Sequence, residues 1–180
     1  MSQSADEASL GMRQSPRGES DTLPTLGPSG KQERLNCWAK KRRQKVRSDF
    51  LSSKLSSITI PNSVEEIGSG AFAGCTSLNS IAVEEGCQYY KSVDGILFDD
   101  EMILLIQCPA GKTSITIPDS VTDVLDMAFK GCSQLTSITF PQSIEFFGNE
   151  AFAFCTGLTS ITFPQSVNHI GIKAFACCTS

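Results

Sequence analysis

Hydrophobic and polar residues follow a pattern that returns every 23 residues after Lys54. Two neighbouring copies read LTSITFPQSIEFFGNEAFAFCTG from Leu135 and LTSITFPQSVNHIGIKAFACCTS from Leu158. Apolar residues fill repeat positions 1, 4 and 6, whereas Ser and Thr fill positions 3 and 5. This alternation predicts a short strand with one apolar face and one face of hydroxyl side chains.

The remainder of each copy is expected to end the strand and return the chain to the core. Pro at position 7 lacks an N–H and stops the strand. An Ala-Phe pair at positions 17 and 18 and a Cys at position 21 then follow. One copy cannot bury these side chains alone, so copies must stack and cover each other. Stacking predicts a Phe column (Phe72, Phe129, Phe152, Phe175) and a Cys column (Cys75, Cys132, Cys155, Cys178).

Five copies, here called coils, start at residues 55, 78, 112, 135 and 158. The second runs for 34 residues, from Leu78 to Gly111, and is therefore 11 residues longer than the period. Within 83–111, two apolar runs flank the acidic residues 99–101. These runs predict a β-hairpin inserted into the array.

The repeat resembles the BspA-type (treponemal) leucine-rich repeats, whose frame is L-x-x-I-x-I-P-x-x-V-x-x-I-x-x-x-A-F-x-x-C. The resemblance covers residues 55–180, and the Tyr-x-x-x-Asp-Gly-x-Leu-Phe element from Tyr90 also matches the family. It implies an α/β-type repeat solenoid with short parallel strands on one face. For function, it implies a non-catalytic scaffold for protein–protein interaction, with adhesion at a cell surface and host or matrix proteins as partners.

The N-terminal third differs from the array in charge. Residues 1–54 contain 11 Lys and Arg against 6 Asp and Glu, a net charge of +5; residues 55–180 contain 4 against 13, a net charge of −9. Residues 1–30 are rich in Ser, Gly and Pro, which predicts a disordered leader. Residues 31–54 combine apolar residues near helical spacing with a run of cations, which predicts a basic amphipathic helix. Its basic patch comprises Lys40, Lys41, Arg42, Arg43, Lys45 and Arg47.

Three roles for this helix are compatible with its sequence. It can cap the open edge of the first coil, since the ends of a solenoid need covering. Its basic run also fits an intracellular or nuclear adaptor that binds nucleic acid or an import receptor. A basic amphipathic helix can also bind calmodulin or acidic lipid.

The hydroxyl-bearing strand face is the predicted surface for a protein ligand. Solenoids generally use this broad face for recognition. The alternative is that Thr merely suits an exposed strand and that repeats copy themselves. The predicted binding residues are Ser57, Thr59, Ser80, Ser114, Thr116, Ser137, Thr139, Ser160 and Thr162.

The sequence predicts no catalytic residue, metal site or cofactor. The chain has one His, His169, at the variable repeat position 12, and lacks a C-x-x-C pair. The stacked Cys residues fit small buried hydrophobes. Cys87 and Cys108 of the long coil form the pair to test for a disulfide, and the acidic residues 99–101 fit a solvated turn.

The location is predicted from targeting signals. Residues 1–20 lack a secretory apolar stretch, and no 18 consecutive apolar residues occur. These features predict a cytoplasmic protein without a membrane span, the basic run allows a nuclear one, and the family resemblance implies the cell surface. Because the chain stops just after the Cys of the last coil, we expect a fragment of a longer array or end-to-end association.

Overall fold

The computed structural model describes residues 55–178. The predicted leader 1–30 and basic helix 31–54 lie outside the described residues. The ten strands are β1 (Ser57–Ile60), β2 (Ser80–Val83), β3 (Tyr90–Val93), β4 (Ile96–Asp99), β5 (Leu104–Gln107), β6 (Ser114–Thr116), β7 (Asp123–Val124), β8 (Ser137–Thr139), β9 (Phe146–Phe147) and β10 (His169–Ile170).

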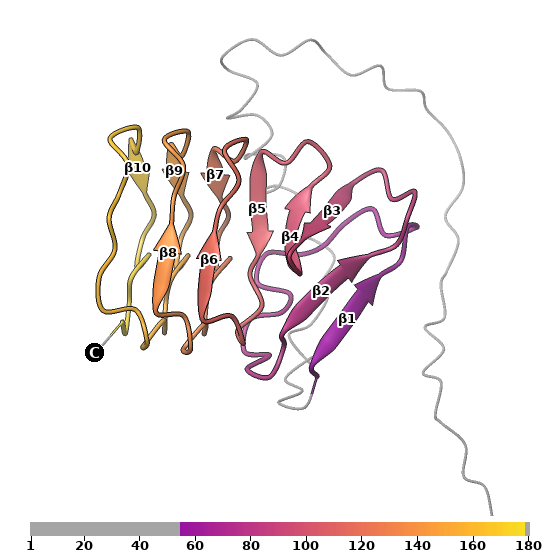
Figure 1. Cartoon of the computed structure of the whole chain (residues 1–180), viewed down its shortest axis with the longest axis horizontal. Coiled ribbons are helices and arrows are strands. Elements are labelled where there is room, and N and C mark those ends of the chain that lie inside the picture. Colours follow the sequence, from indigo (N-terminus) through magenta and orange to yellow (C-terminus); the bar gives the residue numbers. More distant parts are fainter. Residues whose placement is uncertain (1–54, 179–180) are drawn as a thin grey trace, which may run out of the picture. The chain divides into compact units, whose positions relative to one another are not determined.

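The described residues form a repeat solenoid with strands on two sides (Figure 1). The first side carries the parallel pairs β1–β2 and β6–β8, built from repeat positions 3 to 6. The second side is a six-stranded sheet in the order β10-β9-β7-β5-β4-β3. Its short strands β7, β9 and β10 lie in register and parallel at repeat positions 12 and 13.

The expected α/β class is wrong for the described residues, which contain no helix. The chain returns from the second side through turns because two backbone positions per 23-residue coil are left-handed. Position 16 has φ values of 68, 61, 53 and 56° at Gly70, Met127, Glu150 and Lys173, and position 20 has 87, 81, 63 and 58° at Gly74, Gly131, Phe154 and Cys177. Left-handed residues interrupt a right-handed helix after one turn.

The segments that carry the Ala-Phe pairs form a third side of the solenoid. The backbone N–H of Phe129 donates to the carbonyl of Ala151 at 2.8 Å, and that of Phe152 donates to Ala174 at 2.7 Å. These bonds join successive coils although their backbones are turns and not strands. The third and fourth coils are therefore hydrogen-bonded to each other on all three sides, as a close stack requires.

Aromatic stacking holds the core of the last three coils together. The ring of Phe152 lies 4.6 Å from that of Phe129 and 5.0 Å from that of Phe175, with interplanar angles of 8° and 5°. The predicted Phe column therefore exists in these coils. Phe72 is buried but does not take part in this stack.

The Cys residues at repeat position 21 form the second predicted column. Cys75, Cys132 and Cys155 are almost fully buried, and all described Cys residues are free thiols. Sγ of Cys155 donates to the carbonyl of Phe129 at 3.1 Å, and burial raises the pKa of this thiol far above its usual value. A hydrogen bond with the Cys108 thiol and burial raise the pKa of Cys132. The buried thiols of Cys132 and Cys155 therefore remain protonated and unreactive.

The proposed disulfide partners Cys87 and Cys108 are not bridged. Cys87 is half-buried at the entry to β3, whereas Cys108 is buried beside Cys132, whose Sγ lies 3.7 Å from the Cys108 carbonyl oxygen. Cys108 thus takes the place of the column Cys that the long coil lacks. A packing role as a small hydrophobe explains it better than a bridge to Cys87.

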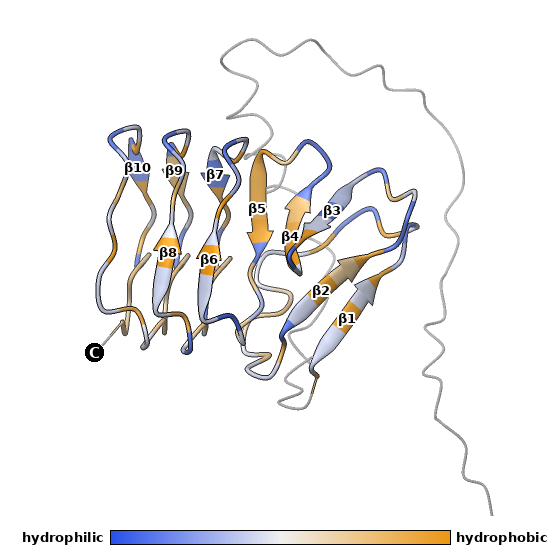
Figure 2. Cartoon of the chain, viewed as in Figure 1, coloured by the Kyte–Doolittle hydropathy of each residue, from blue (hydrophilic) through white to orange (hydrophobic). Residues whose placement is uncertain are grey.

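The insertion in the long coil contains two hairpins where one was expected. The predicted antiparallel pairing around the acidic residues 99–101 is present between β4 and β5. A second hairpin joins β3 to β4 through Asp94 and Gly95, both left-handed at φ 51 and 76°. Two left-handed residues in this order form the two-residue turn that Asp-Gly favours. β4 and β5 are the most apolar strands of the array (Figure 2) and all their residues are buried.

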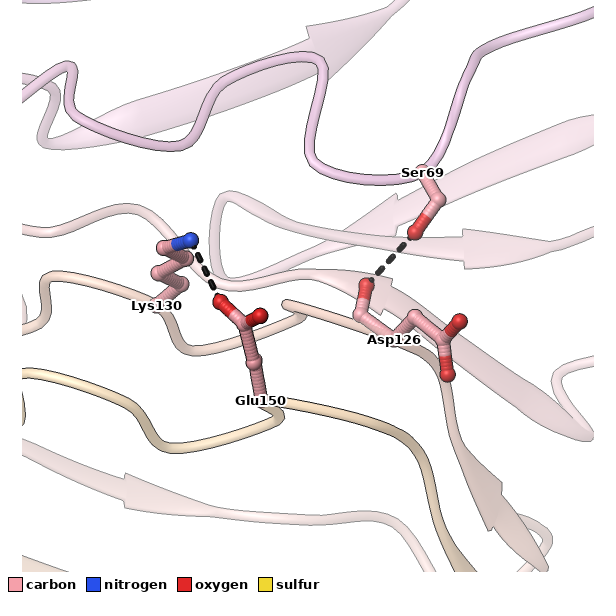
Figure 3. A network of polar contacts seen from close by, with 4 residues as sticks. All are labelled: Ser69, Asp126, Lys130 and Glu150. Carbon is pink, nitrogen blue, oxygen red and sulfur yellow. Dashed lines mark hydrogen bonds and ion pairs between the residues drawn. The ribbon is translucent and has the colours of Figure 1, made fainter. Parts of the chain in front are cut away.

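The insertion lengthens only the second side of the solenoid. On the third side, the first coil therefore meets the third coil directly, and Ser69 Oγ donates to the carbonyl of Asp126 at 2.9 Å (Figure 3). A β-carbon added to Gly70 would lie 2.7 Å from Sδ of Met127. The long coil is thus wide on the second side, and on the third side it reaches the third coil at Cys108, whose N–H donates to the carbonyl of Ala128 at 2.8 Å.

Tyr90 ties the long coil to the first coil and gives the array a pH-dependent contact. Its hydroxyl accepts from the N–H of Ile67 at 2.9 Å and donates to the carbonyl of Glu65 at 3.2 Å. Burial raises the pKa of Tyr90 to about 12. Because the folded pKa exceeds that of an unfolded Tyr, about 10, its contribution is complete below pH 10 and is lost as the pH rises toward 12.

We expect Tyr90→Phe to lower the free energy of unfolding by about 1–2 kcal/mol at pH 7, because the N–H of Ile67 loses its acceptor. The difference between the two proteins should shrink between pH 10 and 12. Urea unfolding at several pH values measures both effects. The exposed Tyr89→Phe is the matched control, and an equal pH dependence in all three proteins would contradict the assignment.

Candidate interaction surface

The predicted binding residues lie on the outer face of the first side of the solenoid. Ser57 pairs with Ser80 across β1 and β2, and Thr59 pairs with Ala82. In β6 and β8, Ser114 pairs with Ser137 and Thr116 with Thr139. All are exposed except the half-buried Ser80. The alternation of repeat positions thus places the hydroxyls outward, with Ile81, Ile115 and Ile138 on the inner face.

The hydroxyls do not form the continuous columns that the sequence predicts. β2 and β6 belong to separate sheets, and in Figure 1 β1 and β2 run obliquely to β6 and β8. The turn of the β3–β4 hairpin occupies the free edge of β2: the N–H of Ile81 donates to the carbonyl of Gly95 at 2.9 Å, and a β-carbon on Gly95 would lie 2.7 Å from Ser80 Oγ. The edge that β6 would have used is therefore already hydrogen-bonded.

The face consists of two patches as a result. We call Ser57, Thr59 and Ser80 the N-terminal hydroxyl patch. The C-terminal hydroxyl patch contains Ser114, Thr116, Ser137, Thr139, Ser160 and Thr162. Ser160 and Thr162 are exposed but belong to no strand, because residues 158–163 of the last coil are not hydrogen-bonded as a strand to β8. On the first side, the strands therefore end in the fourth coil, whereas the outward hydroxyls continue into the fifth.

Two further sets of polar residues border the C-terminal hydroxyl patch and were missed in the sequence. Thr113, Thr136 and Thr159 are exposed at repeat position 2, and Thr136 Oγ1 donates to the carbonyl of Thr113 at 3.0 Å. Beyond the strand-ending Pro, Gln142 and Gln165 are exposed at position 8. The recurrence of Thr at position 2 and of Gln at position 8 was the sequence signal that could have identified them.

The chemistry of the patch is that of neutral hydrogen-bonding groups. Neighbouring strands are about 4.8 Å apart, so the side chains form a regular grid of hydroxyl donors and acceptors. Charged residues border the patch in the third coil, where Lys112 lies before β6 and the exposed Asp119 follows Pro118. Lys130 and Glu150 form an ion pair of 2.6 Å on the third side (Figure 3), and the hydrogen bond from Lys130 lowers the pKa of Glu150. A broad, uncharged polar face suits extended contact with another macromolecule.

The other candidate residues are not assembled into a chemical site. His169 is exposed on β10 and its ring stacks on Phe146 at 4.6 Å. Asp99, expected in a solvated turn, is buried, and its Oδ1 accepts from the N–H groups of Ile103 and Leu104 at 2.8 Å. Within residues 55–178, no three His, Cys, Asp or Glu side chains are grouped to hold a metal ion. The basic patch, residues 40–47, lies outside the described residues.

No helix in the described part of the chain has the length and apolar character needed to cross a membrane.

Residues 46–99 and 107–180 match the family model described as BspA type leucine rich repeat region, in six copies. A comparison with curated proteins gives no match. Among solved structures, the chain is similar to the pneumococcal vaccine antigen PcpA, with 33% identity and a TM-score of 0.60 over 63% of this chain and 29% of that one.

Two other bacterial structures are similar as well. A leucine rich cell surface protein from Faecalibacterium prausnitzii A2-165 has 29% identity and a TM-score of 0.62 over 69% of this chain and 34% of that one. A leucine-rich repeat protein from Eubacterium ventriosum ATCC 27560 has 28% identity and a TM-score of 0.58 over 64% of this chain and 32% of that one. The chain thus matches about a third of the length of these structures.

Proposed function

Because the chain belongs to the BspA-type leucine-rich repeat family, we propose that it is a non-catalytic scaffold that binds a protein ligand. The C-terminal hydroxyl patch carries this proposal. Its six hydroxyls are exposed on the broad side of the solenoid, which is the side that repeat proteins use for recognition. The rigid stack of Phe129, Phe152 and Phe175 behind it holds the grid in place.

The patch supports specificity through many weak contacts. It has hydrogen-bonding groups but neither a charge nor an aromatic anchor of the type that dominates binding hot spots. A ligand must therefore match several hydroxyls at once across successive strands. We propose that the ligand presents an extended polar surface, such as the edge and polar face of another β-rich domain.

We further propose that the protein acts at a cell surface, as an adhesin-like or antigen-like molecule. Two of the similar structures are a vaccine antigen and a cell surface protein, which supports this location. An extracellular ligand, such as a host or matrix protein, is the corresponding partner.

Substitution on the patch tests the binding role. The full chain is passed over a panel of immobilised extracellular matrix proteins, and binding is measured by biolayer interferometry. Thr116→Arg with Thr139→Arg places two long cations in the centre of the grid without touching the core. We expect at least about a tenfold weaker affinity, equivalent to about 1.4 kcal/mol.

A matched control separates the patch from net charge. Gln88→Arg with Asn168→Arg adds the same charge at two exposed positions away from the patch. This control should bind as the unaltered chain does. Equal loss in both double variants would assign the binding to general electrostatics, and retained binding in the patch variant would place the interface elsewhere.

A further inference from the structure

The core-facing side of the second-side sheet continues past the core at β3. The register of the six strands places one residue of each strand in a single row on this side: Ile170, Phe147, Val124, Leu105, Phe98 and Lys91. From Phe147 to Phe98, the row belongs to the core cluster and is at most 1% exposed. Lys91 lies on β3, the end strand of the sheet (Figure 1), and is exposed. β3 therefore overhangs the core.

Two large apolar side chains flank Lys91 on this overhang. Tyr89 directly precedes β3 and continues its pairing with β4, because its carbonyl accepts from the N–H of Asp100 at 3.1 Å. Alternate residues of a strand share a face, so Tyr89 and Val93 lie on the same side as Lys91. The two side chains are 43% and 40% exposed. We call Tyr89, Lys91 and Val93 the β3 ledge.

The β3 ledge is held rigidly although it adds nothing to the core. The neighbouring Tyr90 is tied to the first coil by the 2.9 Å bond from the N–H of Ile67, and β4 behind the ledge is fully buried. Tyr89 and Val93 themselves are not part of the core cluster. A Tyr on a fixed strand offers a large contact area at a low entropic cost of binding. Insertions into solenoid coils, such as the one that carries the ledge, are often binding surfaces.

The surroundings of the β3 ledge are negatively charged. Asp100 lies directly opposite Tyr89 in the hairpin, and residues opposite each other share a face with their β-carbons about 5 Å apart. Asp94, in the turn that follows the ledge, is exposed. Lys91 is the only cation among residues 84–101, which contain six Asp and Glu. The ledge thus places exposed apolar side chains among carboxylates, which favours a cationic ligand.

We propose that the β3 ledge binds an extended cationic segment of a partner protein, in which Lys or Arg alternates with apolar residues. One cation lies over the ring of Tyr89 and pairs with the carboxylate of Asp100, and an apolar side chain packs on Val93. The ledge is a single row of side chains about 13 Å long, which matches alternate residues of an extended chain. Because this ligand is charged, it differs from the one proposed for the neutral hydroxyl patch, and the two proposals are independent.

Peptide binding to the full chain tests the proposal. The probe is a fluorescein-labelled peptide of nine residues in which Lys and Val alternate, and binding is measured by fluorescence anisotropy. The salt concentration is 0.15 M, at which charges farther away than about 8 Å are largely screened. We expect a Kd of about 100 μM or below for this peptide. A second peptide with Glu in place of every Lys should bind at least tenfold more weakly.

Removal of the apolar side chains separates the ledge from general charge attraction. Tyr89→Ser with Val93→Ser leaves the net charge unchanged and should weaken binding of the Lys peptide at least fivefold. Phe154→Ser with Ile172→Ser is the matched control, because it removes two exposed apolar side chains outside the long coil. The control should bind the peptide as the unaltered chain does. Thermal unfolding of both double variants verifies that they remain folded.

Removal of one carboxylate tests the polar half of the contact. Asp100→Asn should weaken binding of the Lys peptide at least threefold, because the cation over Tyr89 loses its partner. Asp119→Asn removes an exposed carboxylate of the third coil and should have no effect.

Several results would overturn the proposal. These are the absence of binding, equal binding of the Lys and Glu peptides, and binding that Tyr89→Ser with Val93→Ser leaves unchanged. Equal losses in Asp100→Asn and Asp119→Asn would reduce the effect to the overall charge of the array. Sedimentation of the full chain covers the remaining occupant: a dimer that Tyr89→Ser with Val93→Ser dissociates would assign the β3 ledge to a second copy of the chain.

Discussion

Phe152→Ala should lower the free energy of unfolding by about 3–5 kcal/mol, which is the cost of deleting a fully buried ring. The ring is completely inaccessible and stacks between Phe129 and Phe175. It also makes edge contacts with Phe140 and Phe147 at 6.1 and 5.6 Å. The substitution removes all four contacts at once and leaves a cavity between two coils. Urea or thermal unfolding measures the loss.

Phe154→Ala is the control for this prediction. Phe154 lies two residues away in the same turn, but its side chain is 49% exposed. Residue 154 has a left-handed backbone, and we expect Ala to keep it, so the substitution removes only the partly exposed ring. We expect a loss below about 1 kcal/mol. Similar losses for Phe152→Ala and Phe154→Ala would contradict a ring stack as the main support of the last three coils.

The sequence predicted those features that each coil specifies through its own residues. The strands, the outward hydroxyls and the buried Phe and Cys each depend on the residue type at a fixed repeat position. The same residue types recur at these positions from coil to coil. The prediction of the Phe stack succeeded at Phe129, Phe152 and Phe175, where 23-residue coils are neighbours. It failed at Phe72, where the next coil in sequence is the long one and does not supply a matching ring.

The features that the sequence did not predict depend on the insertion. The Asp94-Gly95 pair was a readable turn signal, and it would have revealed the hairpin between β3 and β4. The effect of this turn on the neighbouring sheet could not be predicted from the sequence. No residue near Gly95 in the sequence indicates that its carbonyl accepts from the N–H of Ile81 and occupies the edge of β2. The separation of the two hydroxyl patches is therefore a property of the tertiary structure.

The absence of helix in residues 55–178 depends on contacts between coils, which the sequence of one coil does not show. Repeat position 16 is Gly only in the first coil and is Met127, Glu150 and Lys173 in the others. These residues favour helices by propensity, yet all are left-handed in the structure. The contacts between coils, such as the bond from the Met127 N–H to the Asn149 carbonyl at 2.9 Å, override that preference.

The close approach of successive coils gives the second large prediction, at repeat position 14. A β-carbon on Gly148 would lie 2.4 Å from the backbone nitrogen of Asp126 and 2.6 Å from the backbone carbon of Leu125, so the third and fourth coils would have to separate. We expect Gly148→Ala to lower the free energy of unfolding by about 3 kcal/mol, the upper range for overpacking.

Gly68→Ala makes the identical change at the same repeat position of the first coil, where a β-carbon would meet no atom within 4 Å. It should change stability by less than about 0.5 kcal/mol. Thermal unfolding of the two single variants compares them directly, and hydrogen exchange should show that Gly148→Ala loosens the fourth and fifth coils before the first. Equal stability of the two variants would mean that the coils are not held at the contact distance on which the stacked core depends. Because both substitutions alter glycine propensity alike, the difference between them isolates the contact between coils.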